Sequence, residues 1–91
     1  MENPVPRYSI EPVDKIARIT HFKIVSLDVI LGQKAIINCR VYTDNGFDMG
    51  YNITKFLEGQ EYLEWGNDDN YLIEKCRQKV QEELPNLPSL F

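Results

Sequence analysis

The change from strand-like to helix-like sequence lies in residues 61–72, which read EYLEWGNDDNYL. This segment holds the only tryptophan, Trp65, and two of the five tyrosines, around a run of four polar residues. Upstream of it, apolar residues alternate with a period of two, as they do in β-strands, and downstream they repeat with a helical period. The segment is therefore expected to join a small sheet to the helix that covers it.

The residues before this junction predict an antiparallel meander of three strands, or of four if residues 17–22 pair separately. Residues 18–31 are rich in β-branched side chains, and residues 35–41 alternate between apolar and polar side chains. The sequence Asp44-Asn45-Gly46 predicts a hairpin turn, because Asn and Gly both tolerate positive φ. Gly50 is expected to mark a bulge in the strand that follows. That strand is expected to place four apolar residues on one face: Phe47, Met49, Tyr51 and Ile53.

The residues after the junction predict a C-terminal helix that ends at Pro85, preceded by a short helical turn at residues 60–65. Asn67 or Asp68 can cap the longer helix, and Asp69 is favourable near the positive end of its dipole. An apolar stripe follows at helical spacing: Leu72, Ile73, Cys76, Val80 and Leu84. The predicted fold class is α+β, a small antiparallel meander of three to four strands covered by a C-terminal helix.

The chain length predicts one domain with extended arms at both ends. Residues 1–13 are expected to form an N-terminal arm, because three prolines there oppose helix and central-strand pairing. Residues 14–85 are expected to form the domain, and residues 86–91 a C-terminal tail. The arms carry apolar side chains that are expected to cover sheet edges or to contact neighbouring molecules: Val5, Tyr8, Ile10, Leu87, Leu90 and Phe91.

The net charge of −4 is unevenly distributed, with an excess of two positive charges in residues 1–43 and of six negative charges in residues 44–91. The acidic second half argues against a nucleic-acid surface there. No apolar segment approaches the roughly 20 residues of a membrane helix, and the N-terminus lacks the order of a signal peptide. We therefore expect a protein made in a reducing cytoplasm, with Cys39 and Cys76 as buried free thiols.

The densest acidic cluster holds Glu61, Glu64, Asp68 and Asp69. Carboxylates of this kind can hold a divalent cation, but the spacing lacks the glycine and the twelfth-position acid of an EF-hand loop. Capping of the following helix explains Asp68 and Asp69 without a ligand. No metal or cofactor is therefore expected.

The remaining candidates for chemistry are weak. His21 is the only histidine, and it has no companion ligand or orienting partner nearby in the sequence. Trp65, with Tyr62 and Tyr71, is interpreted as a wedge between sheet and helix in preference to a binding platform. The sequence predicts a protein that is not an enzyme.

The segment Trp65-Gly66-x-Asp68-Asp69-x-Tyr71 before a final helix resembles short, mostly uncharacterised proteins of tailed bacteriophages. The strand pair around residues 35–41, the turn at residues 44–46 and Glu61-Tyr62 belong to the same resemblance, which covers half to two thirds of the chain. The longer N-terminal arm and the tail after Pro85 depart from the short form of the family. The resemblance implies a virion component and brings no catalytic residues with it.

We therefore expect a non-enzymatic structural component of a bacteriophage particle, in the capsid, neck or tail. Its partners are expected to be other virion proteins or copies of itself, with no nucleic acid at the acidic half and no membrane. The alternative is a small soluble adaptor or inhibitor that binds one protein through its acidic face or a sheet edge. The expected contact residues are Val5, Tyr8, Ile10, Asn45, Glu61, Trp65, Asp68, Asp69, Leu87, Leu90 and Phe91.

Overall fold

The computed structural model describes residues 6–15 and 17–87 of the 91-residue chain. Within these residues, four β-strands precede two α-helices and a 3-10 turn. The elements are β1 (Tyr8–Asp14), β2 (Arg18–Ile30), β3 (Lys34–Thr43), β4 (Asp48–Glu58), α1 (Gln60–Trp65), α2 (Asp69–Glu83) and η1 (Leu84–Asn86). This confirms the predicted α+β fold, a meander followed by a C-terminal helix.

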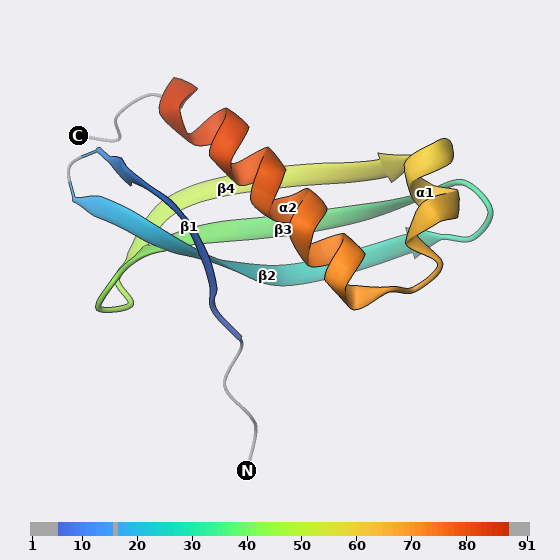
Figure 1. Ribbon diagram of the computed structural model, residues 1–91, viewed down its shortest axis with the longest axis horizontal. Coiled ribbons are helices and arrows are strands. Elements are labelled where there is room, and N and C mark those ends of the chain that lie inside the picture. Colours follow the sequence, from blue (N-terminus) through green and yellow to red (C-terminus); the bar gives the residue numbers. More distant parts are fainter. Residues whose placement is uncertain (1–5, 16, 88–91) are drawn as a thin grey trace, which may run out of the picture.

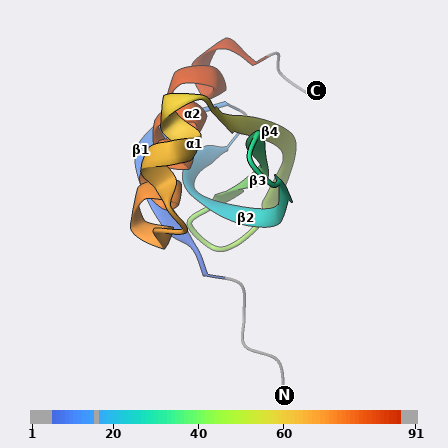
Figure 2. The same cartoon turned by 90° about the vertical axis from the view of Figure 1, so that its right-hand side faces the viewer.

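The strands form one antiparallel sheet in chain order, β1-β2-β3-β4. The longest ladder joins β2 to β3, from Ile19 opposite Thr43 to Ile30 opposite Lys34. Helix α2 crosses one face of the sheet obliquely, and α1 lies at the end where β4 stops (Figure 1). Both helices lie on the same side of the curved sheet (Figure 2). The sheet therefore has a helix side and an open side.

The first strand lies where the sequence predicted an arm. Residues 8–14 pair with residues 18–22, so the fourth strand of the meander is β1, and residues 17–22 do not form a separate strand. Pro12 is tolerated because the register shifts between Ser9 and Val13, which leaves Pro12 outside the regular ladder. The remaining arm and tail residues, 1–5 and 88–91, lie outside the described residues.

The core lies between the helix side of the sheet and α2. Strand β3 contributes alternate residues and α2 contributes every third or fourth residue, as their periods require. The fully buried side chains include Phe22, Ala35, Ile37, Val41, Leu57, Val80 and Leu84. Burial of each large apolar side chain contributes about 1.5–3 kcal/mol to the hydrophobic driving force.

Two residues with positive φ turn the chain between α1 and α2. Gly66, at φ 48°, ends α1 in the left-handed conformation, and Asn67 follows at φ 65°. Asp68 then caps α2, because its Oδ1 accepts hydrogen bonds from the backbone N–H of Asn70 at 2.9 Å and of Tyr71 at 3.3 Å. The predicted cap at Asp68 is confirmed.

The turn between β3 and β4 is also confirmed. Gly46, at φ 89°, donates its N–H to the carbonyl of Thr43 at 2.9 Å. The prediction that Phe47 shares the apolar face of β4 is wrong, because its backbone bonds to Thr43 and keeps it in the turn, where its side chain is exposed. Gly50, at φ 80°, lies in the predicted bulge, where the register shifts between Arg40 and Tyr42.

Cys39 of β3 and Cys76 of α2 are buried free cysteines whose side chains meet in the core. The hydrogen bond with Cys76 lowers the pKa of the Cys39 thiol. The same hydrogen bond raises the pKa of the Cys76 thiol, and burial raises it further. This hydrogen-bonded pair of free thiols lies between the middle of the sheet and the middle of α2.

Candidate protein-contact site

The predicted contact residues of the two arms dock, where they are described, on their own chain. Tyr8 is half-buried, with its ring 5.3 Å from the ring of Phe22, and Ile10 is buried in the core. Leu87 packs against the same core, and its carbonyl accepts a hydrogen bond from the Lys15 ammonium at 2.6 Å. Val5, Leu90 and Phe91 lie outside the described residues. Tyr8, Ile10 and Leu87 therefore stabilise the domain itself.

In the acidic cluster of Glu61, Glu64, Asp68 and Asp69, the charge of Glu61 is neutralised by two lysines. Glu61 forms ion pairs with Lys55 at 3.1 Å and with Lys75 at 3.4 Å. Burial would raise the pKa of Glu61, but the hydrogen bonds and charges of the two lysines outweigh it and hold that pKa below its usual value. Within the described ranges, no group of three or more His, Cys, Asp or Glu side chains could hold a metal ion. Asp69 is exposed beside the capping residue Asp68.

The tip of the β3–β4 hairpin is an exposed surface. Asn45 accepts a hydrogen bond from the Thr43 hydroxyl, which fixes the turn. Phe47 follows it with 65% of its surface exposed. The predicted contact residue Asn45 therefore lies near an exposed aromatic side chain that the sequence placed on the apolar face of the following strand.

Trp65 is buried, with 6% of its surface exposed, and acts as the predicted wedge between sheet and helix. Its ring packs edge-on against Tyr62, whose hydroxyl accepts a hydrogen bond from Gly32 N–H at 3.0 Å. The indole Nε1 has no hydrogen-bond partner among the described residues. A cavity of about 240 Å³ lies between α1 and the end of β2, lined by Trp65, Leu31, Val29 and their neighbours.

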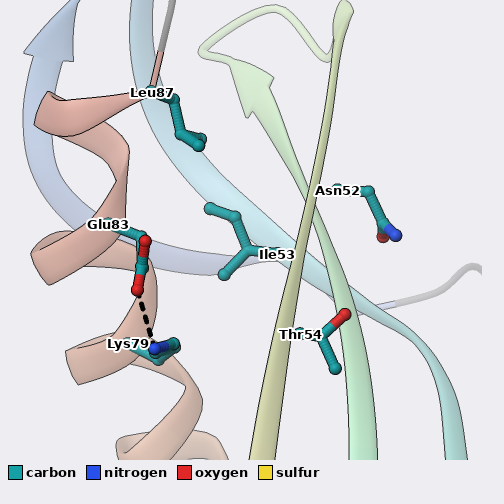
Figure 3. Close-up of a pocket in the computed structure, with 6 residues that line it drawn as sticks. All are labelled: Asn52, Ile53, Thr54, Lys79, Glu83 and Leu87. Atoms are coloured by element: carbon teal, nitrogen blue, oxygen red, sulfur yellow. Dashed lines mark hydrogen bonds and ion pairs between the residues drawn. The ribbon is translucent and has the colours of Figure 1, made fainter.

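A second cavity, of about 190 Å³, lies between β4 and the C-terminal part of α2 (Figure 3). Ile53 points into it from the strand, and Lys79 and Glu83 line it from the helix. Lys79 donates to Glu83 at 2.7 Å, and this hydrogen bond raises the pKa of Lys79. Because the two charges satisfy each other, the cavity presents no unpaired charge to an ionic ligand.

The second half of β2 is the surface that the sequence did not predict. Five of the eight large apolar side chains that are exposed within the described residues belong to residues 25–31: Val25, Leu27, Val29, Ile30 and Leu31. A continuous apolar segment is typical of a strand that is buried on both faces. The sequence pattern therefore did not indicate that these side chains are exposed. The available signal was its length, since one small helix cannot cover both faces of a 13-residue strand.

Among the described residues, His21 is not part of a recognisable catalytic arrangement. Its Nδ1 is 2.7 Å from the hydroxyl of Thr20, its neighbour in the chain. A general base needs a partner that orients it and a substrate within reach.

No family model, no curated protein and no solved structure is significantly similar to this chain. Among the described residues, no helix has the length and apolar content to cross a membrane.

Proposed function

We propose that this chain is a non-enzymatic structural component of a bacteriophage particle that acts through protein–protein contacts. The observation that carries the proposal is the exposed apolar segment of residues 25–31. Among the described residues, this part of β2 pairs with β3 alone, whereas residues 18–22 of β2 also pair with β1. Unpaired strand edges with apolar side chains bind other chains. The resemblance of residues 65–71 to tailed-phage proteins supports a virion as the assembly in question.

The rest of the described surface supports a contact role as well. Phe47 at the β3–β4 turn is 65% exposed. Glu61 contributes little net attraction of its own, because it is paired with two lysines. We therefore assign the main contact to β2 and a smaller one to the hairpin tip.

The test is to purify particles by density gradient from cells that make this protein and to quantify the chain by mass spectrometry. The expected result is several copies per particle. Leu31→Lys should reduce incorporation, because Leu31 is 86% exposed and its loss does not disturb the core. Gln33→Lys is the matched control, since it adds the same charge in the same turn without removing an apolar side chain. A chain that stays in the soluble fraction contradicts the proposal.

The predicted arms are tested with shorter deletions than the sequence suggested. Removal of residues 1–13 would delete most of β1 (Tyr8–Asp14) and unfold part of the sheet. Deletion of residues 1–6 or 88–91 leaves all strands and helices intact. If the arms contact neighbours, these variants keep a native circular dichroism spectrum and lose incorporation. Normal incorporation of both variants rejects the arm contacts.

The adaptor function remains the second candidate, because the same strand edge can accept one extended segment of a single partner. It predicts a one-to-one complex in light scattering and no copies in gradient-purified particles.

A further inference from the structure

The edge of β2 is open along residues 23–30. Strand β1 pairs with β2 only from Arg18 to Phe22. Beyond Phe22, β2 has β3 on one side and, among the described residues, no strand on the other; this edge is the lower rim of the sheet to the right of β1 in Figure 1. The peptide groups of this segment that point away from β3 are therefore available to pair with another strand.

The side chains along this edge do not oppose such pairing. Proteins usually protect an edge with lysines, prolines or an inward-pointing charge. Between Ile24 and Leu31 the only charged residue is Asp28, and no ion pair with it is found among the described residues. Val25, Leu27, Val29 and Ile30 are each 40–48% exposed. The edge is both unpaired and apolar.

The pairing of β2 with β3 shows which way each side chain points, since residues directly opposite share a face. Leu27 lies opposite Ile37 and Val29 opposite Ala35, both buried on the helix side. Ile24 also faces the helix side, opposite Cys39, because the extra residue of a bulge at Val25 separates it from Ser26. The edge therefore presents three apolar residues on the helix side: Ile24, Leu27 and Val29.

The open side of the same edge carries the polar residues. Ser26 lies opposite Asn38, and Asp28 lies opposite Ile36. Lys23 and Ile30 complete this side, opposite Arg40 and Lys34. Lys23 is placed over the ring of Tyr42, 4.5 Å from its centroid.

We propose that two copies of this chain pair antiparallel through residues 23–30 of β2, about a two-fold axis at Leu27, to make one continuous eight-stranded sheet. This inference rests on the proposed contact function and specifies its partner as a second copy. Leu27 then faces the partner's Leu27, and Val29 faces the partner's Ile24. On the open side, Asp28 faces the partner's Ser26, and Lys23 lies diagonally across from the partner's Asp28. The two-fold axis repeats each contact, including two attractive Lys23–Asp28 neighbours.

The alternative registers are worse for identifiable reasons. A shift by one residue would place helix-side residues opposite open-side residues. An axis at Asp28 would bring two carboxylates face to face. An axis at Ser26 would place the partner's Val29 beside Phe22, where Tyr8 of β1 already pairs. The axis at Leu27 fills the open segment from Lys23 to Ile30 and ends before β1 begins.

The test uses a property of the two-fold axis, because only a residue on the axis meets its own copy. Across the axis the Cα atoms at position 27 are about 4.5–5.5 Å apart, within the range of a disulfide. At position 29 they are about 13 Å apart, from four residues of strand rise. Leu27→Cys should therefore form a covalent dimer with oxidised glutathione, which takes up the two protons and two electrons of the thiols. The native cysteines do not interfere, because both are buried.

The controls are Val29→Cys on the same strand and Leu63→Cys, an exposed apolar position on α1. Leu27→Cys should cross-link at least about tenfold faster than either control, because paired thiols have an effective concentration in the millimolar range. Light scattering across a concentration series should give twice the chain mass of 10.6 kDa for the wild type. Leu27→Lys should give the single mass with unchanged circular dichroism, whereas Leu63→Lys should remain a dimer.

Equal cross-linking of Leu27→Cys and Leu63→Cys, with a monomeric wild type at all concentrations, overturns the pairing. This outcome is distinct from failure of the proposed function, which is measured by the presence of the chain in purified particles. A monomer that is incorporated into particles refutes the pairing alone. A symmetric dimer supports the pairing even if it is absent from particles.

Discussion

Replacing Asp68 by alanine removes the side-chain acceptor at the start of α2. One carboxylate oxygen accepts two backbone N–H groups, from Asn70 at 2.9 Å and from Tyr71 at 3.3 Å. Neither donor has an intrahelical partner, because both belong to the first turn. The carboxylate also lies at the positive end of the helix dipole. The two contributions can be separated by comparing Asp68→Ala with Asp68→Asn, since asparagine keeps the acceptor and loses the charge.

Loss of the acceptor costs about 1 kcal/mol, and loss of the charge costs roughly 0.3–1 kcal/mol. We therefore expect Asp68→Ala to lower the free energy of unfolding by about 1.5 kcal/mol and Asp68→Asn by about 0.5 kcal/mol. For a domain of this size, 1 kcal/mol corresponds to about 4–8 °C in Tm. The expected decreases in Tm are thus about 6–12 °C for alanine and about 2–4 °C for asparagine. Asp69→Ala is the control, because Asp69 provides no capping hydrogen bond.

The assay is thermal unfolding followed by circular dichroism, with and without calcium. If Asp68 were a cation ligand, calcium at 100 times its Kd would add about 2.7 kcal/mol to the wild type. Calcium would then add nothing to the stability of Asp68→Asn. Asp68→Asn would also lower the free energy of unfolding as much as Asp68→Ala does. Stabilisation by calcium that disappears in Asp68→Asn refutes the capping argument, and so does an Asp68→Ala variant as stable as the wild type.

Three further predictions concern the core and the helix surface. Phe22→Ala should lower the free energy of unfolding, measured by urea titration, by about 3–5 kcal/mol, because the Phe22 ring is fully buried. A loss below about 1 kcal/mol would contradict its place in the core. Ellman's reagent should react with neither Cys39 nor Cys76 in the native protein and with both in urea, whereas a fast-reacting native thiol would show that the pair is accessible. Partial burial and the hydrogen bond to Glu64 raise the pKa of Tyr71 from 10.0 to about 12. Because the pKa of Tyr71 is higher in the folded than in the unfolded state, this contribution to stability is complete below pH 10 and is lost as the pH rises to about 12. Glu64→Gln should lower the pKa of Tyr71 in a phenolate absorbance titration.

Sequence periodicity predicted the elements whose partners are close in the chain. The stripe of Leu72, Cys76 and Val80 is buried as its spacing requires. The Asp44-Asn45-Gly46 turn forms because Gly46 takes up positive φ. In both cases the local sequence and the tertiary packing favour the same structure.

Periodicity was insufficient where the register shifts. Pro12 argued against a strand, but a shift in the β1–β2 pairing removes the need for its missing N–H. The bulge at Val25 exchanges the two faces of β2 and disrupts its alternation. By periodicity alone, the exposed segment of residues 25–31 was therefore indistinguishable from a strand covered on both sides. Of the predicted contact residues, Ile10 and Trp65 are buried, because long-range packing uses apolar groups that the sequence alone assigned to partners.

The hydrogen bonds between β1 and the C-terminal part of the chain suggest an order of folding events that kinetics can test. Strands β2, β3 and β4 are joined by short turns, so their pairing costs little loop-closure entropy. Arg77 instead bonds to the carbonyl of Ser9 across 68 residues, and Gln81 to the backbone of Glu11 across 70 residues. We expect contacts of such long range to form late in folding, because the loop-closure entropy between the two segments must be overcome first. Substitutions at Arg77 and Gln81 should therefore accelerate unfolding and leave the folding rate nearly unchanged.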